Sequence, residues 1–224
     1  YKDMGYLSDA MVNYLARLGW SYGDQELFTR QELIEKFSWK NVQTSAAVFN
    51  PDKLLWLNGE YIKTSPPGQV AQALVPLLEN AGLKAEVSAV SQNWLAQLVV
   101  LVKERAKTLV EMVEWVKPYF GEAVMFEEEA AKKFLTPAIA PMLGKLLKRF
   151  ETIPSFSKQE WEEAFKALVE EEAIKMGQLA QPVRVALTGR TASPGLFEVM
   201  EVLGRDRTLA RLRAGIERAY SGQA

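Results

Sequence analysis

The chain has 224 residues, of which 48% are hydrophobic, and its 27 lysines and arginines against 28 acidic residues give a net charge of −1. It contains no cysteine and no histidine, which excludes disulfides, thiolate or histidine metal sites and Ser-His-Asp catalysis. This composition predicts a folded, cytoplasmic protein without a uniformly basic coat for nucleic acid.

Helix-start signals occur from the first residues onward. We expect an N-terminal helix that begins near Ser8, ends at Gly19 and buries one apolar stripe, formed by Met11, Leu15 and Leu18. Capping boxes, in which Ser or Thr is followed three residues later by Glu, predict three further starts at Thr29/Glu32, Thr108/Glu111 and Ser157/Glu160.

Prolines and glycines predict further helix starts and ends. A capping side chain ahead of a proline predicts helices that open at Asn50-Pro51 and Ser193-Pro194. We expect helices to stop at Gly82, Gly177 and Gly204. No alternating β-branched run is bounded by a hairpin turn, so the fold class predicted is all-α, with roughly ten helices.

Two breaks divide the chain. Ser65-Pro66-Pro67-Gly68 separates an N-terminal module from the rest, and Gly121 with its aromatic neighbours precedes Glu127–Glu129. We therefore expect three parts, residues 1–66, 67–126 and 127–224.

The richest apolar stretch, around Leu95–Val102, is too short for the roughly 18–20 apolar residues that span a bilayer and predicts a core helix. Because the first residue is Tyr, we expect the chain to be a piece of a longer protein.

The sequence offers no catalytic cluster. Glu170-Glu171-Glu172 cannot converge on one metal ion, since consecutive helical residues point about 100° apart. We expect the charges of Glu127–Glu129 to favour a helix N-terminus. Of the six tryptophans, Trp56, Trp94 and Trp161 are expected in the core, and Trp20 and Trp39 remain undecided between core and RNA stacking.

The positive charge gathers at the C-terminal end as arginine. Between residues 184 and 218 there are seven arginines and no lysine, opposed by four acids, so this segment is about +3 by count (7 − 4). Guanidinium groups suit forked hydrogen bonding and stacking on bases. A solvated, arginine-rich helix face is the alternative interpretation.

One segment combines these charges with a predicted helix start. In Gln181-Pro182-Val183-Arg184-Val185-Ala186-Leu187-Thr188-Gly189-Arg190-Thr191-Ala192-Ser193-Pro194-Gly195-Leu196-Phe197, a helix that carries Arg184 runs into a loop, and a new helix opens at Ser193-Pro194. Unpaired backbone N–H groups at such an opening suit phosphates or base acceptor atoms. The segment predicts a cationic notch.

At these residues the sequence resembles a known family. The run from Arg184 to Phe197 and the following Glu198–Arg207 look like the closing signature of bacterial-type glutamyl-tRNA synthetases. Met4-Gly5-Tyr6-Leu7, Asn13–Trp20 and the Phe49–Leu54 segment with Trp56-Leu57-Asn58 are similar to the same family, so the resemblance covers essentially the whole chain.

The resemblance implies a division of labour. Residues 1–66 would be the stem-contact module that touches the inner elbow of tRNA, and residues 67–126 and 127–224 would be two helical anticodon-binding subdomains. The catalytic domain, with ATP and Mg, would lie upstream, so this fragment should carry no catalytic residue, metal or cofactor of its own. The expected partner is a glutamate-specific tRNA, bound by a monomer that uses neither DNA nor a membrane.

The resemblance also implies residue roles. Arg184 matches an arginine that contacts the anticodon, while Ser193, Pro194 and Leu196 match the loop that receives its middle base. Arg105 matches the arginine that senses the third base, which in the family accompanies charging of glutamate tRNA alone. Two alternatives stay open: a non-catalytic helical scaffold for another protein, and a repurposed synthetase descendant without tRNA recognition.

Overall fold

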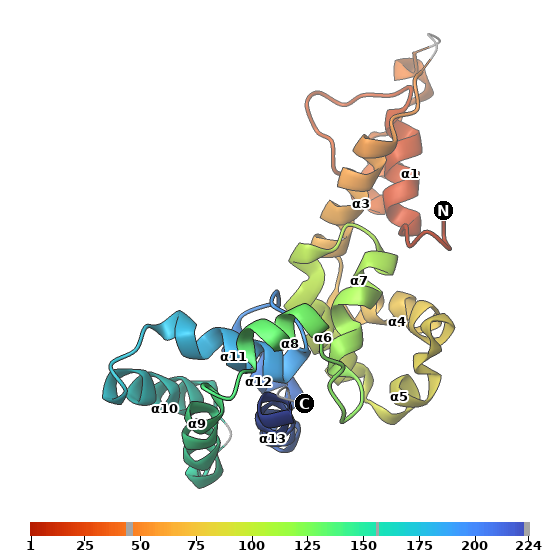
Figure 1. Ribbon diagram of the computed structural model, residues 1–224. Coiled ribbons are helices and arrows are strands. Elements are labelled where there is room, and N and C mark those ends of the chain that lie inside the picture. Colours follow the sequence, from red (N-terminus) through yellow and green to blue (C-terminus); the bar gives the residue numbers. More distant parts are fainter. Residues whose placement is uncertain (44–46, 156, 222–224) are drawn as a thin grey trace. The chain divides into compact units, whose positions relative to one another are not determined.

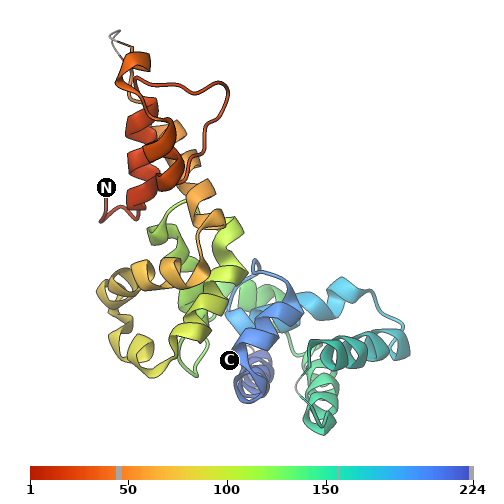
Figure 2. The same cartoon turned by 180° about the vertical axis from the view of Figure 1, so that it is seen from behind.

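The computed structural model describes residues 1–43, 47–155 and 157–221, and it divides into two compact units, Tyr1–Val116 and Lys117–Ala224. Throughout the described residues every regular element is a helix, apart from one isolated bridge between Trp20 and Val42. The prediction of an all-α fold is confirmed (Figures 1 and 2). Within the same ranges, no helix combines the length and the apolar character that crossing a membrane requires.

The first unit contains seven α-helices and three short helical turns within its described residues. They are α1 (Ser8–Arg17), α2 (Arg30–Lys36), η1 (Trp39–Asn41), α3 (Pro51–Thr64), α4 (Pro67–Leu78), η2 (Glu79–Leu83), α5 (Lys84–Ala89), α6 (Gln92–Val102), η3 (Lys103–Arg105) and α7 (Leu109–Val116). Helix α1 packs against α3, and α4 packs against α6 and α7.

The buried face of α1 differs from the predicted stripe. Tyr14 packs with Leu54 and Leu57 of α3, and Met11 and Leu18 lie at the edge of this cluster. Leu15, which the pattern placed in the stripe, is 55% exposed. Tyr14, about 100° away from Leu15 on the helix, makes the apolar contact with α3 instead.

A buried amide ties the first unit together. Asn58 of α3 is fully buried; its Oδ1 accepts from the backbone N–H of Leu7 at 2.8 Å, and its Nδ2 donates to the carbonyl of Lys107 at 2.6 Å. Gly5, beside these bonds, accepts from the backbone N–H of Leu109 at 2.9 Å. One side chain therefore joins the N-terminal segment to the start of α7.

The second unit consists, in its described residues, of η4 (Lys117–Tyr119) and six α-helices. These are α8 (Glu128–Phe134), α9 (Ala140–Thr152), α10 (Lys158–Glu171), α11 (Met176–Thr188), α12 (Leu196–Leu203) and α13 (Arg205–Ser221). Helix α13 packs against α9, α11 and α12 (Figures 1 and 2). A Cβ on Gly215 of α13 would lie 2.5 Å from the Cβ of Ala186, so glycine permits the close approach of α13 to α11.

Arg211 holds the start of the second unit against this helix pair. Its side chain is fully buried and donates to four carbonyls, those of Pro118, Phe120, Gly121 and Leu187. Burial, together with the nearby charge of Arg207, lowers the pKa of Arg211 to about 10. Arg211 therefore has a structural role, since it bonds carbonyls inside the second unit.

Several predicted helix starts are confirmed. Thr29 and Glu32 form a complete capping box at α2, and Asn50 caps α3 with Pro51 as its first residue. Thr108 and Ser157 each accept a hydrogen bond from the backbone N–H three residues later. The two glutamates of those boxes differ: Glu111 accepts from the backbone N–H of Lys107 instead of Thr108, whereas Glu160 accepts from the hydroxyl of Ser157 and from its backbone. Glu127 precedes α8, whose first turn is acidic as expected.

Two of the local predictions are wrong. Gly177 is the second residue of α11 and does not end a helix. Helix α12 begins at Leu196, after Gly195, instead of at Ser193-Pro194. The hydroxyl of Ser193 accepts from Arg184 and donates to the carbonyl of Pro194 at 2.9 Å, so it does not cap the helix. The stop at Gly204, with a φ of +79°, is confirmed.

The tryptophans divide between core and surface. Trp161 is 2% exposed, as predicted, and Trp20 is also 2% exposed. Trp56 is 43% exposed, so its assignment to the core is wrong. Trp39 is 82% exposed and meets Phe37 edge-to-face, with ring centroids 5.3 Å apart. The division into residues 1–66, 67–126 and 127–224 stays a prediction.

Candidate functional site

Arg184 points at the loop that precedes α12. It lies on α11, half-buried, and its Nη1 donates to the carbonyl of Ser193 at 3.2 Å, to the carbonyl of Pro194 at 2.7 Å and to the hydroxyl of Ser193. One guanidinium nitrogen thus binds two consecutive residues of the loop. The structure brings together Arg184, Ser193 and Pro194, three of the five residues singled out in the sequence.

The beginning of this loop is fixed by Gly189. It ends α11 in the left-handed conformation, with a φ of +75°, and its carbonyl accepts from the backbone N–H of Glu127 at 2.9 Å. A Cβ at this position would overlap the carbonyl oxygen of Met125 and lie 2.9 Å from its carbon. Only glycine combines this φ with this close approach, so the segment before α8 anchors the loop.

The end of the loop is partly buried. Ser193 is 9% exposed and Leu196 is 8% exposed, and Pro194 is also buried. Gly195 between them is exposed and serves as the N-cap of α12 without a side chain. The exposed surface at this end of the loop is therefore mainly the backbone of Gly195, and the hydrogen bonds from Arg184 hold the two residues before it.

A residue that the sequence analysis missed covers this loop. The Glu198 carboxylate accepts from Lys158 Nζ at 2.6 Å, and a Cβ on Gly195 would lie 2.8 Å from its Cδ. The hydrogen bond from Lys158 lowers the pKa of the Glu198 carboxyl, partial burial opposes this shift, and a bond from its own backbone N–H adds to it. Its position three residues after Gly195 was the available signal, since glutamate there favours a helix N-terminus.

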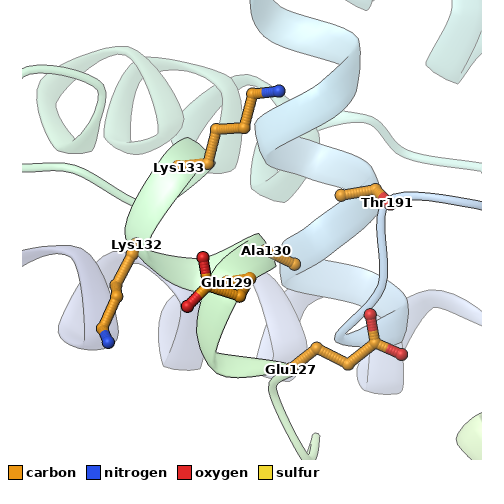
Figure 3. A pocket seen from close by; sticks show the side chains of 6 residues that line it. All are labelled: Glu127, Glu129, Ala130, Lys132, Lys133 and Thr191. Carbon is orange, nitrogen blue, oxygen red and sulfur yellow. The ribbon is translucent and has the colours of Figure 1, made fainter.

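A shallow hollow borders the same loop. It encloses about 380 Å³ and is lined by Glu127, Glu129, Ala130, Lys132, Lys133 and Thr191. Figure 3 shows the two lysine side chains of α8 pointing in different directions, so their ammonium groups do not converge. Across the described part of the chain, no group of three or more acidic side chains is placed to hold a metal ion.

Arg105, the fifth predicted residue, belongs to the other unit. It ends η3, is exposed, and places its guanidinium carbon 5.4 Å from the ring centroid of Trp115. A guanidinium over an indole face is a favourable cation–π pair. The pair is a flat, charged surface of the kind on which a base can stack.

Several of the C-terminal arginines bond to other groups of the second unit. Arg205 donates to the carbonyls of Ile153 and Glu151. Ion pairs join three further arginines to glutamates on other elements: Arg190 to Glu127, Arg213 to Glu151 and Arg218 to Glu128.

Comparison with known protein families agrees with this architecture. Residues 69–216 match the model described as the anticodon binding domain. Residues 1–56 match the model of the catalytic domain of class I tRNA synthetases of the E and Q type. The helical fold and these two matches define the class, a portion of a class I aminoacyl-tRNA synthetase with a helical anticodon-binding domain.

Individual relatives show which class I aminoacyl-tRNA synthetases this chain resembles. Glutamate–tRNA ligase of Geobacter sulfurreducens is 49% identical over 216 residues, which are 96% of this chain and 46% of that protein. Glutamate–tRNA ligase 1 of Syntrophus aciditrophicus is 46% identical over all 224 residues, or 47% of its length. The crystal structure of a glutamate tRNA ligase from Elizabethkingia meningosepticum superimposes with a TM-score of 0.79 at 28% identity, covering 95% of this chain and 41% of that one.

The chain belongs to the bacterial glutamate–tRNA ligase family and corresponds to its C-terminal half. It spans somewhat less than half the length of the relatives that it matches.

Proposed function

We propose that this chain recognises the anticodon loop and the inner elbow of tRNA, as the C-terminal half of a glutamate–tRNA ligase. The observation that carries the proposal is the loop held by Arg184 inside the region that matches an anticodon binding domain. Single-stranded RNA loops are recognised by splaying bases out and bonding their edges. A rigid backbone loop with an exposed glycine suits this mode of binding.

Within this proposal each candidate residue has its own role in binding the anticodon. The loop from Ser193 to Leu196 receives the middle anticodon base. Arg184 holds this loop in shape, because its Nη1 donates to the carbonyls of Ser193 and Pro194. Arg105, spread over Trp115, senses the third base. A guanidinium donates in a fixed plane and stacks on a base at the same time, which a lysine cannot do.

The activity of the whole protein is part of the same proposal. The relatives are glutamate–tRNA ligases about twice as long as this chain, and we place ATP, Mg and the attachment of glutamate in the portion of such a protein that this chain lacks. The chain alone would then bind glutamate-specific tRNA as a monomer in the cytoplasm without charging it. Residues 1–66 would contact the inner elbow.

A binding titration tests the proposal. The chain is titrated against glutamate tRNA and against the same tRNA with a substituted anticodon, at several salt concentrations. We expect tighter binding of the native anticodon and an affinity that falls with salt, by about 0.7 log units per tenfold change in salt for each single-strand phosphate contacted. Equal, salt-independent and weak binding of both RNAs would overturn the proposal and favour a helical scaffold for another protein.

A further inference from the structure

The Glu198 carboxylate occupies the space directly above the exposed residue of the candidate loop. A Cβ on Gly195 would overlap Oε2 of Glu198 and lie 2.8 Å from its Cδ. Glu198 therefore folds back over Gly195. The feature depends on glycine at 195, since any side chain there would displace the carboxylate.

Lys158 holds this carboxylate in place. Its Nζ lies 2.6 Å from Oε1 of Glu198, and it comes from the first residue of α10, a helix that packs against α12. The hydrogen bond with Glu198 raises the pKa of Lys158, and the charges of Glu201 and Glu162 contribute to the same shift. The side chains are 42% and 44% exposed, and ion pairs this exposed exchange partners readily.

An RNA loop that approaches Gly195 would meet a negative charge at close range. Its phosphates repel the carboxylate, and its base edges compete with Glu198 for the backbone donors at the start of α12. The ammonium of Lys158, in contrast, is a good phosphate partner once Glu198 has left it. The same ion pair thus contains an obstacle to RNA and a ligand for it.

We propose that Glu198 and Lys158 form a displaceable latch over Gly195: RNA binding expels the Glu198 carboxylate, and Lys158 passes from that carboxylate to an RNA phosphate. The latch rests on the proposed anticodon-binding function and adds a discriminating step. An RNA that makes good base contacts opens the latch, and an RNA that offers only phosphates gains too little to do so. Glu198 therefore raises specificity while it lowers affinity.

The test compares two substitutions with the same change in charge on the same helix. Glu198→Gln abolishes the ionic latch, whereas Glu201→Gln removes an exposed acid of α12 that also acts on Lys158 from a distance. The probe is an isolated anticodon stem–loop of glutamate tRNA, with a version carrying a substituted anticodon beside it. We expect Glu198→Gln to bind the substituted stem–loop about 3–10-fold more tightly and to discriminate less between the two RNAs. Glu201→Gln should shift both affinities equally and by less than about twofold.

A double-substitution cycle with Lys158→Met tests the exchange of partners. Lys158→Met should weaken RNA binding several-fold more in the Glu198→Gln background than in the parent, because only there is the ammonium already free for phosphate. Parent-like melting temperatures establish that the variants fold. Identical behaviour of the Glu198 and Glu201 variants, with the parent binding in an anticodon-dependent way, would overturn the latch alone. Absence of anticodon-dependent binding by the parent would overturn the proposed function, and the latch with it.

Discussion

Replacing Arg184 by alanine tests whether its hydrogen bonds hold the loop from Ser193 to Leu196 in shape. The Nη1 group donates to two carbonyls and one hydroxyl of Ser193 and Pro194. A hydrogen bond from a charged donor contributes about 1.5–3 kcal/mol net, and the half-buried position of Arg184 favours the lower part of that range. If this energy orders the loop for RNA, Arg184→Ala should weaken binding of the native anticodon stem–loop by roughly 10–40-fold, at about 1.4 kcal/mol per factor of ten.

The assay is fluorescence anisotropy with labelled stem–loops, and the matched control is Arg213→Ala. Arg213 is an exposed arginine of the same unit that pairs with Glu151 at 2.6 Å, so its removal changes the net charge identically. We expect the Arg184 variant to lose discrimination between native and substituted anticodons, whereas the Arg213 variant keeps it. Equal losses of affinity in both variants, with discrimination intact, would mean that Arg184 contributes only charge and does not order the loop.

Three further predictions concern the fold that supports the site. Asn58→Leu should lower the free energy of unfolding by about 2–4 kcal/mol in urea denaturation, because it strands the buried backbone groups that the amide satisfies; a loss below 1 kcal/mol would contradict this. Gly189→Ala should cost more than about 2 kcal/mol by the same measurement, and Gly121→Ala, with a similar φ but open space around it, about 1–2 kcal/mol; equal losses would argue against the contact with Met125. The backbone N–H of Thr29 is the chief cause that lowers the pKa of Glu32 to about 2. Because this pKa lies below the usual value of the group, the stabilising effect of the carboxylate is complete above about pH 4.5 and is lost as the pH falls through about 2. Carboxyl NMR titration should show a midpoint near 2, and a midpoint near 4.5 would contradict the capping box.

The sequence was most informative where a local signal had no competitor. Asn50-Pro51 and the Thr29/Glu32 box start helices as expected, because the side-chain oxygen of each N-cap residue accepts from the backbone N–H three residues later. Ser193-Pro194 carries the same signal, yet α12 starts at Leu196. There the guanidinium of Arg184, nine residues away, takes the Ser193 hydroxyl. A contact between elements overrode a capping preference that contributes only about 1 kcal/mol.

Side-chain direction was the harder part of the site to predict. Seven arginines in the C-terminal segment suggested a basic surface, but Arg211 turns inward to four carbonyls and Arg213 meets Glu151 across the unit. Composition counts charges and does not reveal their partners. Glu198 escaped notice for the same reason, because its importance depends on Lys158, forty residues earlier in the chain.

Photo-crosslinking from the middle anticodon base shows directly which protein segment that base contacts. The middle base of a glutamate anticodon is uridine, so 4-thiouridine can replace it in the stem–loop with little change of shape, and ultraviolet light then joins it to whatever protein group it touches. We expect a crosslinked peptide that contains the loop from Ser193 to Leu196, and loss of that crosslink in Arg184→Ala. A crosslink confined to other helices, unchanged by that substitution, would contradict it.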